Sequence, residues 1–189
     1  MSIKIDLKIF LFALLFFFTK QIEIYATVMI FAFIHELAHL VCGLILGFKA
    51  DSIKINPFGF QICFQSYVED YNQKAKLGNR LCIKKMILAL AGPCMNLLIM
   101  FGCLIIGNYF EYNLETIFYA NLLLVIFNLL PIYPLDGGRI LKQWVHIQKG
   151  KQKSYEIVNR VSKITVIFLT FVTSIVILYI HNIAFLVIL

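Results

Sequence analysis

Two histidines one helical turn apart, with a glutamate beside the first, are the residues of this chain best suited to chemistry. They form the H-E-x-x-H motif His35-Glu36-Leu-Ala-His39. On a helix, residues four apart lie on one face, so both imidazoles can reach a single zinc ion. Glu36 then lies beside the metal, where it can take a proton from an attacking water and pass it to a departing amine. The motif predicts a zinc site with peptide-hydrolysing chemistry.

The residues around the motif distinguish a zinc site from an ordinary pair of surface histidines. In a soluble helix, two histidines one turn apart are usually surface residues. Here they lie in an apolar run over residues 24–48. Burying imidazoles and a carboxylate in such a run costs several kcal/mol unless they pair or bind a metal. The apolar surroundings therefore favour metal binding.

A catalytic zinc ion usually has three protein ligands, so the two histidines need a third. The candidates in apolar segments are Cys42, Cys94, Cys103, Asn96 and Asp136. Asp136 ends the segment Asn128-Leu-Leu-Pro-Ile-Tyr-Pro-Leu-Asp136 and is followed by two glycines. The prolines interrupt helical hydrogen bonding, and the glycines leave room for another helix to approach. Unwound backbone is tolerated at membrane depth where it lines a cavity. The alternative is an ordinary aspartate at a helix end near Arg139.

The composition defines the class of protein that must position these residues. Of 189 residues, 61% are hydrophobic and 14% are charged, whereas soluble domains have about 45–50% and about 25%. The apolar residues would fill about five or six membrane spans of about 20 residues each. These values exclude a soluble globule, a disordered chain and a nucleic-acid-binding module. They predict a single domain over residues 1–189, an all-α polytopic membrane protein.

Apolar runs with no charged residue other than Glu36 predict five spans, over residues 9–19, 24–48, 86–106, 117–134 and 164–180. The apolar tail at 183–189 is too short to cross a bilayer and is either a docked stub or the start of a sixth span. Lys and Arg concentrate in residues 49–85 and 139–163, and residues 108–116 have none. The positive-inside rule then places the N-terminus and both cationic segments in the cytoplasm.

Residues 58–65 alternate between apolar and polar side chains, which is typical of a short strand. Residues 52–56 could be its partner, with Pro57 and Gly59 forming the turn. This segment predicts a β-hairpin on the cytoplasmic side or a loop that dips into the membrane.

The H-E-x-x-H motif, followed by Asn128-Leu-Leu-Pro-Ile-Tyr-Pro-Leu-Asp136-Gly-Gly-Arg, resembles the site-2 protease family of intramembrane zinc metalloproteases, and most of all its sporulation branch. The resemblance extends from the second predicted span to about Leu141 and includes Ala91-Gly-Pro in the third. It implies one zinc ion bound by His35, His39 and Asp136. It also implies Glu36 as the catalytic acid/base and Asn128 as a donor to the substrate carbonyl or oxyanion. The sporulation branch usually adds a sixth span and a CBS domain, and other branches carry PDZ domains; we expect neither domain here.

The resemblance predicts a multi-pass protein of a bacterial cell membrane that cleaves membrane-embedded or membrane-associated proteins, such as a sigma-factor precursor. Its expected partners are those substrates, membrane proteins that inhibit or activate it, and the lipid bilayer, without nucleic acid. Two alternatives use the same residues. A metal carrier or channel would use the histidines and Asp136 as a transit site, and an inactive scaffold would only bind membrane helices. The variant Glu36→Gln separates the protease from the carrier or channel, because it removes the proton acceptor and leaves the metal ligands in place. The presence of all three ligands and Glu36 argues against the scaffold.

Overall fold

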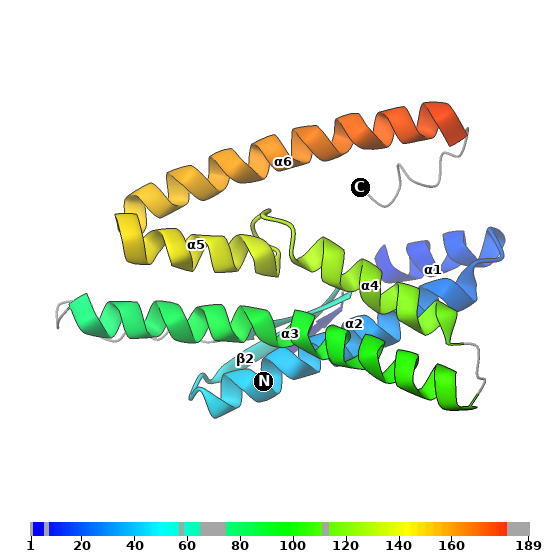
Figure 1. The fold of residues 1–189 in the computed structure, drawn as a ribbon, viewed down its shortest axis with the longest axis horizontal. Coiled ribbons are helices and arrows are strands. Elements are labelled where there is room, and N and C mark those ends of the chain that lie inside the picture. The colour runs from blue at the N-terminus through cyan, green and yellow to red at the C-terminus, as the bar shows by residue number, and fades with distance from the viewer. Residues whose placement is uncertain (1, 6–7, 57–58, 65–74, 111–113, 181–189) are drawn as a thin grey trace. The chain divides into compact units, whose positions relative to one another are not determined.

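A computed structural model describes residues 2–5, 8–56, 59–64, 75–110 and 114–180. The chain is mostly helical and forms two compact units, an N-terminal unit of residues 1–128 and a C-terminal unit of residues 129–189. The N-terminal unit contains four helices and a three-stranded sheet among its described residues, and the C-terminal unit contains two helices (Figure 1).

Three helices form the body of the N-terminal unit: α2 (Ile22–Ile45), α3 (Ala75–Phe110) and α4 (Glu115–Asn128). Each packs against the other two. The buried side chains of these helices include small ones, such as Ala32 on α2, Ala89 on α3 and Ala120 on α4. Small side chains let helix backbones approach closely, as is usual for helices that pack within a membrane. The short α1 (Lys8–Phe18) lies against α2, with the rings of Phe16 and Tyr25 stacked 4.8 Å apart.

The sheet has the order β1-β2-β3, with β1 (Ser2–Ile5) parallel and β3 (Gly59–Phe64) antiparallel to the central β2 (Ala50–Asn56). β2 and β3 coincide with the strand and partner that the alternating pattern predicts. The predicted turn lies partly outside the described residues, which omit 57 and 58. The sheet contacts α2, where the ring of Phe64 lies so close to Gly43 that a Cβ there would overlap it. The sequence pattern did not predict β1.

Among the described residues, three helices are long and apolar enough to cross a membrane: Ile22–Ile45, Gly78–Gly107 and Lys151–Ile175. At 1.5 Å per residue, the 24 residues of α2 span about 36 Å, which exceeds the roughly 30 Å of hydrocarbon. The 11 residues of α1 and the 14 of α4 reach only about 17 and 21 Å. Three of the five predicted spans therefore coincide with helices of sufficient length, and the helix of the predicted 117–134 span ends at Asn128.

Large apolar side chains are exposed along these three helices, as Phe33, Leu98 and Ile167 illustrate. Soluble monomers rarely expose continuous apolar surfaces of this size. Hydrocarbon is the solvent that such surfaces require, so the chain is an integral membrane protein. The cationic segments expected between spans are partly helical, because α3 begins at Ala75 and the C-terminal helix begins at Lys151.

The C-terminal unit is a helical hairpin preceded by a non-helical segment, residues 129–135. Helix α5 (Asp136–Lys149) turns at Gly150 into α6 (Lys151–Ile180), and the two pack side by side near the turn (Figure 1). Gly150 has φ 82°, a left-handed conformation that favours glycine. Val145 on α5 and Val158 on α6 are buried, and the Ser154 hydroxyl donates to the carbonyl of Lys142 at 2.6 Å.

Candidate metal centre

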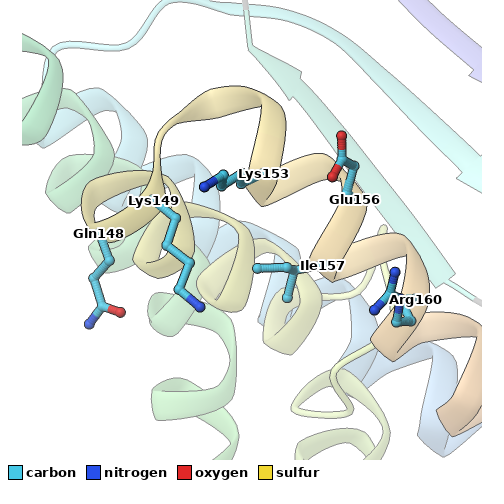
Figure 2. Close-up of a pocket in the computed structure, with 6 residues that line it drawn as sticks. All are labelled: Gln148, Lys149, Lys153, Glu156, Ile157 and Arg160. Atoms are coloured by element: carbon cyan, nitrogen blue, oxygen red, sulfur yellow. The ribbon is translucent and has the colours of Figure 1, made fainter.

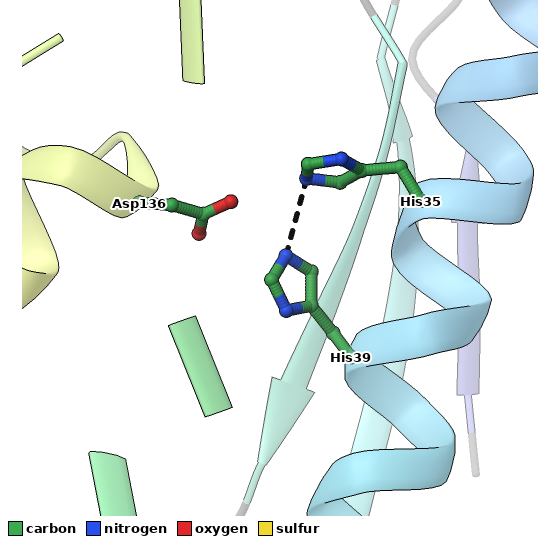
Figure 3. Close-up of side chains that lie close together, drawn as sticks. All are labelled: His35, His39 and Asp136. Atoms are coloured by element: carbon green, nitrogen blue, oxygen red, sulfur yellow. Dashed lines mark hydrogen bonds between the residues drawn. The ribbon is translucent and has the colours of Figure 1, made fainter. Parts of the chain in front are cut away.

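His35 and His39 project from one face of α2, as their four-residue spacing predicts. Both side chains are buried, each with 3% of its surface exposed. The rings meet edge to face with centroids 4.8 Å apart, and their Nε2 atoms are 3.2 Å from each other (Figure 3). The structure thus turns the same nitrogen of each ring toward one point.

Hydrogen bonds at the far nitrogens decide which atoms face each other. The Nδ1 of His39 lies 2.7 Å from the carbonyl oxygen of Leu88. A carbonyl only accepts, so Nδ1 carries the hydrogen and the neutral ring keeps its lone pair on Nε2. The Nδ1 of His35 lies 3.1 Å from the Oδ1 of Asn96, and this ring has the same tautomer when its Nδ1 donates to that oxygen.

Two Nε2 atoms 3.2 Å apart can hold one cation together, either a proton shared between the rings or a metal ion. Metal-bound histidines characteristically donate their other ring N–H to a carbonyl or a carboxylate, which fixes the orientation of the ring. The donor set and its outer hydrogen bonds therefore fit a zinc ion, which binds neutral imidazole.

One face of α3 contacts this pair through Leu88, Gly92 and Asn96, which are spaced four residues apart. Gly92 lies directly against the ring nitrogens, and a Cβ at this position would overlap Nε2 of both histidines. The Ala91-Gly-Pro segment is therefore the place where α3 approaches the motif on α2. Pro93 beside it is fully buried.

Asn96, a candidate third ligand in the sequence, contacts His35 instead of taking a ligand position. The side chain has no exposed surface, and its Oδ1 orients His35. Its Nδ2 has no hydrogen-bond partner within the described part of the chain, nor has the buried Oδ1 of Asn121 on α4. Its position one helical turn after Gly92 is the signal that places it beside the motif.

Asp136 belongs to the C-terminal unit, where it is the first residue of α5 (Figure 3). It is 4% exposed, and Nη1 of Arg139 lies 3.5 Å from its Oδ1. The glycines after it serve a contact within this unit. A Cβ on Gly137 would overlap the backbone of Leu129, and one on Gly138 would overlap the backbone of Ile132. They let α5 begin against the proline-containing segment.

Helix α6 holds that segment in place. The backbone N–H of Tyr133 donates to the hydroxyl of Ser162 at 3.0 Å, and this hydroxyl donates to the carbonyl of Pro131 at 3.4 Å. The ammonium of Lys142 on α5 lies 4.4 Å from the ring centroid of Tyr133 and 4.0 Å from that of Tyr155. These contacts fix the backbone from which Asp136 projects.

The remaining predicted residues lie on N-terminal helices. Glu36 follows His35 on α2 and is half-buried. Asn128 is the last residue of α4, and its amide donates to the carbonyl of Leu124 at 3.0 Å. Among the alternative ligands, Cys42 contacts the carbonyl of Ile87 through its sulfur, and Cys94 is exposed on α3.

Comparisons with known proteins agree with this chemistry. Residues 108–172 match peptidase family M50. A zinc metalloprotease of Methanocaldococcus jannaschii is 29% identical over 136 residues, which are 69% of this chain and 36% of that protein. Stage IV sporulation protein FB of Bacillus subtilis is 24% identical over 160 residues, which are 83% of this chain and 52% of that protein. The chain thus spans about a third to a half of the length of these relatives.

A solved structure has the same fold. The site-2 protease from Methanocaldococcus jannaschii aligns with a TM-score of 0.72 and 23% identity, over 98% of this chain and 84% of that one.

Proposed function

We propose that this chain, as a relative of the family M50 peptidases with a site-2 protease fold, is an intramembrane zinc metalloendopeptidase. One observation supports the proposal above all others. Two buried histidines on a candidate membrane span bring their Nε2 atoms within 3.2 Å of each other, and both rings are held by hydrogen bonds at Nδ1. Packing alone gives no reason to bury such a pair, whereas a metal site requires it.

In this proposal His35 and His39 bind zinc together with Asp136. All three side chains are buried, and a carboxylate is a common third ligand beside two imidazoles. The M50 match includes Asp136 together with the non-helical segment that precedes it. Three ligands leave the fourth position of a tetrahedral ion open, which distinguishes catalytic zinc from structural zinc. The N-terminal and C-terminal units then work as one catalytic domain.

Zinc, when bound, lowers the pKa of water and polarises a carbonyl. The chain itself supplies the proton transfers and the contacts with the substrate. Glu36 accepts the proton of the attacking water and returns it to the departing amine. Asn128 uses one amide N–H within α4, and its second N–H remains to donate to the substrate carbonyl as negative charge develops there.

The expected substrates are proteins embedded in or attached to the membrane, because the histidines lie on a candidate span. The similarity to Stage IV sporulation protein FB extends the proposal to regulated proteolysis during sporulation, with a sigma-factor precursor as one such substrate. By the positive-inside rule, the N-terminus and the cationic ends of α3 and α6 face the cytoplasm of a bacterial cell. Membrane proteins that inhibit or activate the protease complete the proposed set of partners.

The zinc content of the detergent-purified chain tests the ligand set. We expect about one zinc per chain in the wild type, and its loss in His35→Ala and in Asp136→Ala, because each removes one of three ligands. Asp51→Ala is the matched control, since it removes an exposed carboxylate on β2. Zinc that persists in Asp136→Ala would place the third ligand elsewhere. A wild-type protein that is folded but binds no zinc would overturn the proposal.

Asn96 gives a second test, because it acts on the metal only through His35. Asn96→Leu is expected to weaken zinc binding by about 10–100-fold, as the loss of outer hydrogen bonds to metal ligands usually does. Asn96→Asp keeps an acceptor for the Nδ1 hydrogen and should restore much of the affinity. Competition with a chelator measures both values. Equal affinities in Asn96→Leu and the wild type would show that this hydrogen bond does not support the site.

A further inference from the structure

The C-terminal unit contains a hollow of about 560 Å³ at the turn between α5 and α6 (Figure 2). Gln148 and Lys149 line it from the end of α5. The first turns of α6 contribute Lys153, Glu156, Ile157 and Arg160. None of these residues belongs to the proposed zinc site.

The local structure explains why cations gather there. Lys153, Ile157 and Arg160 are spaced four and three residues apart, so they share one face of α6. Lys149, one residue before the turn at Gly150, lines the same hollow from the end of α5. Three cations and one carboxylate line the hollow, which gives it a net charge of +2. No ion pair joins Lys149, Lys153 or Arg160 to another residue in the part of the chain that the structure describes.

The position of the hollow along α6 relates it to the membrane. The sequence of α6 carries no charge from Ile164 to its end at Ile180. Arg160 precedes Ile164 by four residues, or about 6 Å along the helix axis. Trp144 on α5 and Tyr155 on α6 are each 50% exposed nearby in the sequence, and such aromatic residues favour the membrane interface. With the apolar part of α6 in hydrocarbon, the hollow lies at the level of the lipid headgroups.

We propose that this hollow binds the phosphate group of an anionic phospholipid. The Arg160 guanidinium donates to two phosphate oxygens, while Lys149 and Lys153 act as compact positive charges. Ile157 provides an apolar contact for the glycerol carbons. The positive-inside rule accounts for cations on this side of the membrane. That rule does not require three cations to line one hollow around an apolar side chain. Free inorganic phosphate has the same chemistry and is the competing source of the anion.

Native mass spectrometry of the full chain, released from detergent micelles, tests this site. The probes are phosphatidylglycerol and phosphatidylcholine with the same acyl chains, each with and without inorganic phosphate. We expect preferential retention of phosphatidylglycerol and a loss of about tenfold in its affinity in Arg160→Gln. Lys163→Gln is the matched control, because it removes an exposed cation from the same helix outside the hollow. Glu156→Gln should change the affinity in the opposite direction, because it removes the one carboxylate that lines the hollow.

Circular dichroism of each variant ensures that a loss of binding is not a loss of fold. Equal retention of the two lipids would overturn the proposal, and so would equal losses in Arg160→Gln and Lys163→Gln. If inorganic phosphate binds in the hollow and the two lipids are retained equally, the ligand is the free anion and the lipid proposal is wrong. None of these results depends on zinc or on cleavage, so the proposal fails or stands separately from the proposed protease activity.

Discussion

Replacing Glu36 by glutamine is expected to reduce peptide cleavage by about 10²–10⁴-fold, the usual contribution of a general acid/base. Glutamine has nearly the same size as glutamate but cannot accept the proton of the attacking water. Glu36 is adjacent to His35 on α2 but is not one of the proposed ligands, so the zinc content should stay at the wild-type value. A fluorogenic apolar peptide in detergent micelles reports cleavage, and elemental analysis of the same sample reports zinc.

The result also separates the protease from a metal carrier or channel. A transit site formed by the histidines and Asp136 would not need Glu36 as a proton acceptor, so Glu36→Gln would leave zinc flux into proteoliposomes largely intact. Exposed Glu23 lies on the same helix more than three turns away, and Glu23→Gln is the matched control. Cleavage that is reduced equally in both variants would contradict the role of Glu36.

Gly92→Ala is expected to weaken zinc binding by at least about 100-fold, the upper end of the range for changes outside the ligands themselves. The added Cβ would overlap Nε2 of His35 and of His39, the two atoms that face the metal. Either the rings turn away from their hydrogen bonds to Asn96 and Leu88, or α3 moves away from α2. Both responses separate the ligands. Titration with cobalt, followed by its visible absorption, measures the affinity and reports a change in ligand geometry.

The same helix offers a control that isolates the steric effect. At Gly102 no described atom outside the local helix backbone lies within 4 Å of the place that a Cβ would take. Gly102→Ala should leave zinc binding unchanged and stabilise α3 slightly, since alanine favours a helix over glycine by about 1 kcal/mol. Wild-type zinc affinity in Gly92→Ala would show that α3 does not lie as close to the histidines as the structure places it.

The features of the fold that depend on residues close together in the sequence could be predicted from the sequence. The four-residue spacing of His35 and His39 places them on one helix face, and the alternation over residues 58–65 indicates β3. β1 was missed, because four residues carry too little pattern and their partner, β2, lies about fifty positions further along the chain. The predicted spans over residues 86–106 and 164–180 cover only the apolar parts of α3 and α6, since hydropathy does not mark the charged turns with which both helices begin.

The outer contacts of the site were harder to anticipate. A buried asparagine at membrane depth indicates a polar contact between helices but does not identify the partner. Asn96 meets His35, 61 residues away, because Gly92 lets α3 approach α2 at that level. The glycines after Asp136 suggested the approach of another helix, whereas they accommodate the backbone of residues 129–133 in their own unit. In both cases the sequence indicates that a close contact exists, and only the structure identifies what lies there.

The tight contact between Gly92 and the two imidazoles also determines the direction from which a substrate can arrive. No space for even a methyl group remains between the backbone of α3 and the Nε2 atoms. A peptide carbonyl is larger than a methyl group, so it cannot enter along this flank. In the proposed zinc site, a substrate carbonyl would therefore have to reach the metal from a side other than the one that α3 occupies. Inhibitors that chelate the metal would have to follow the same route.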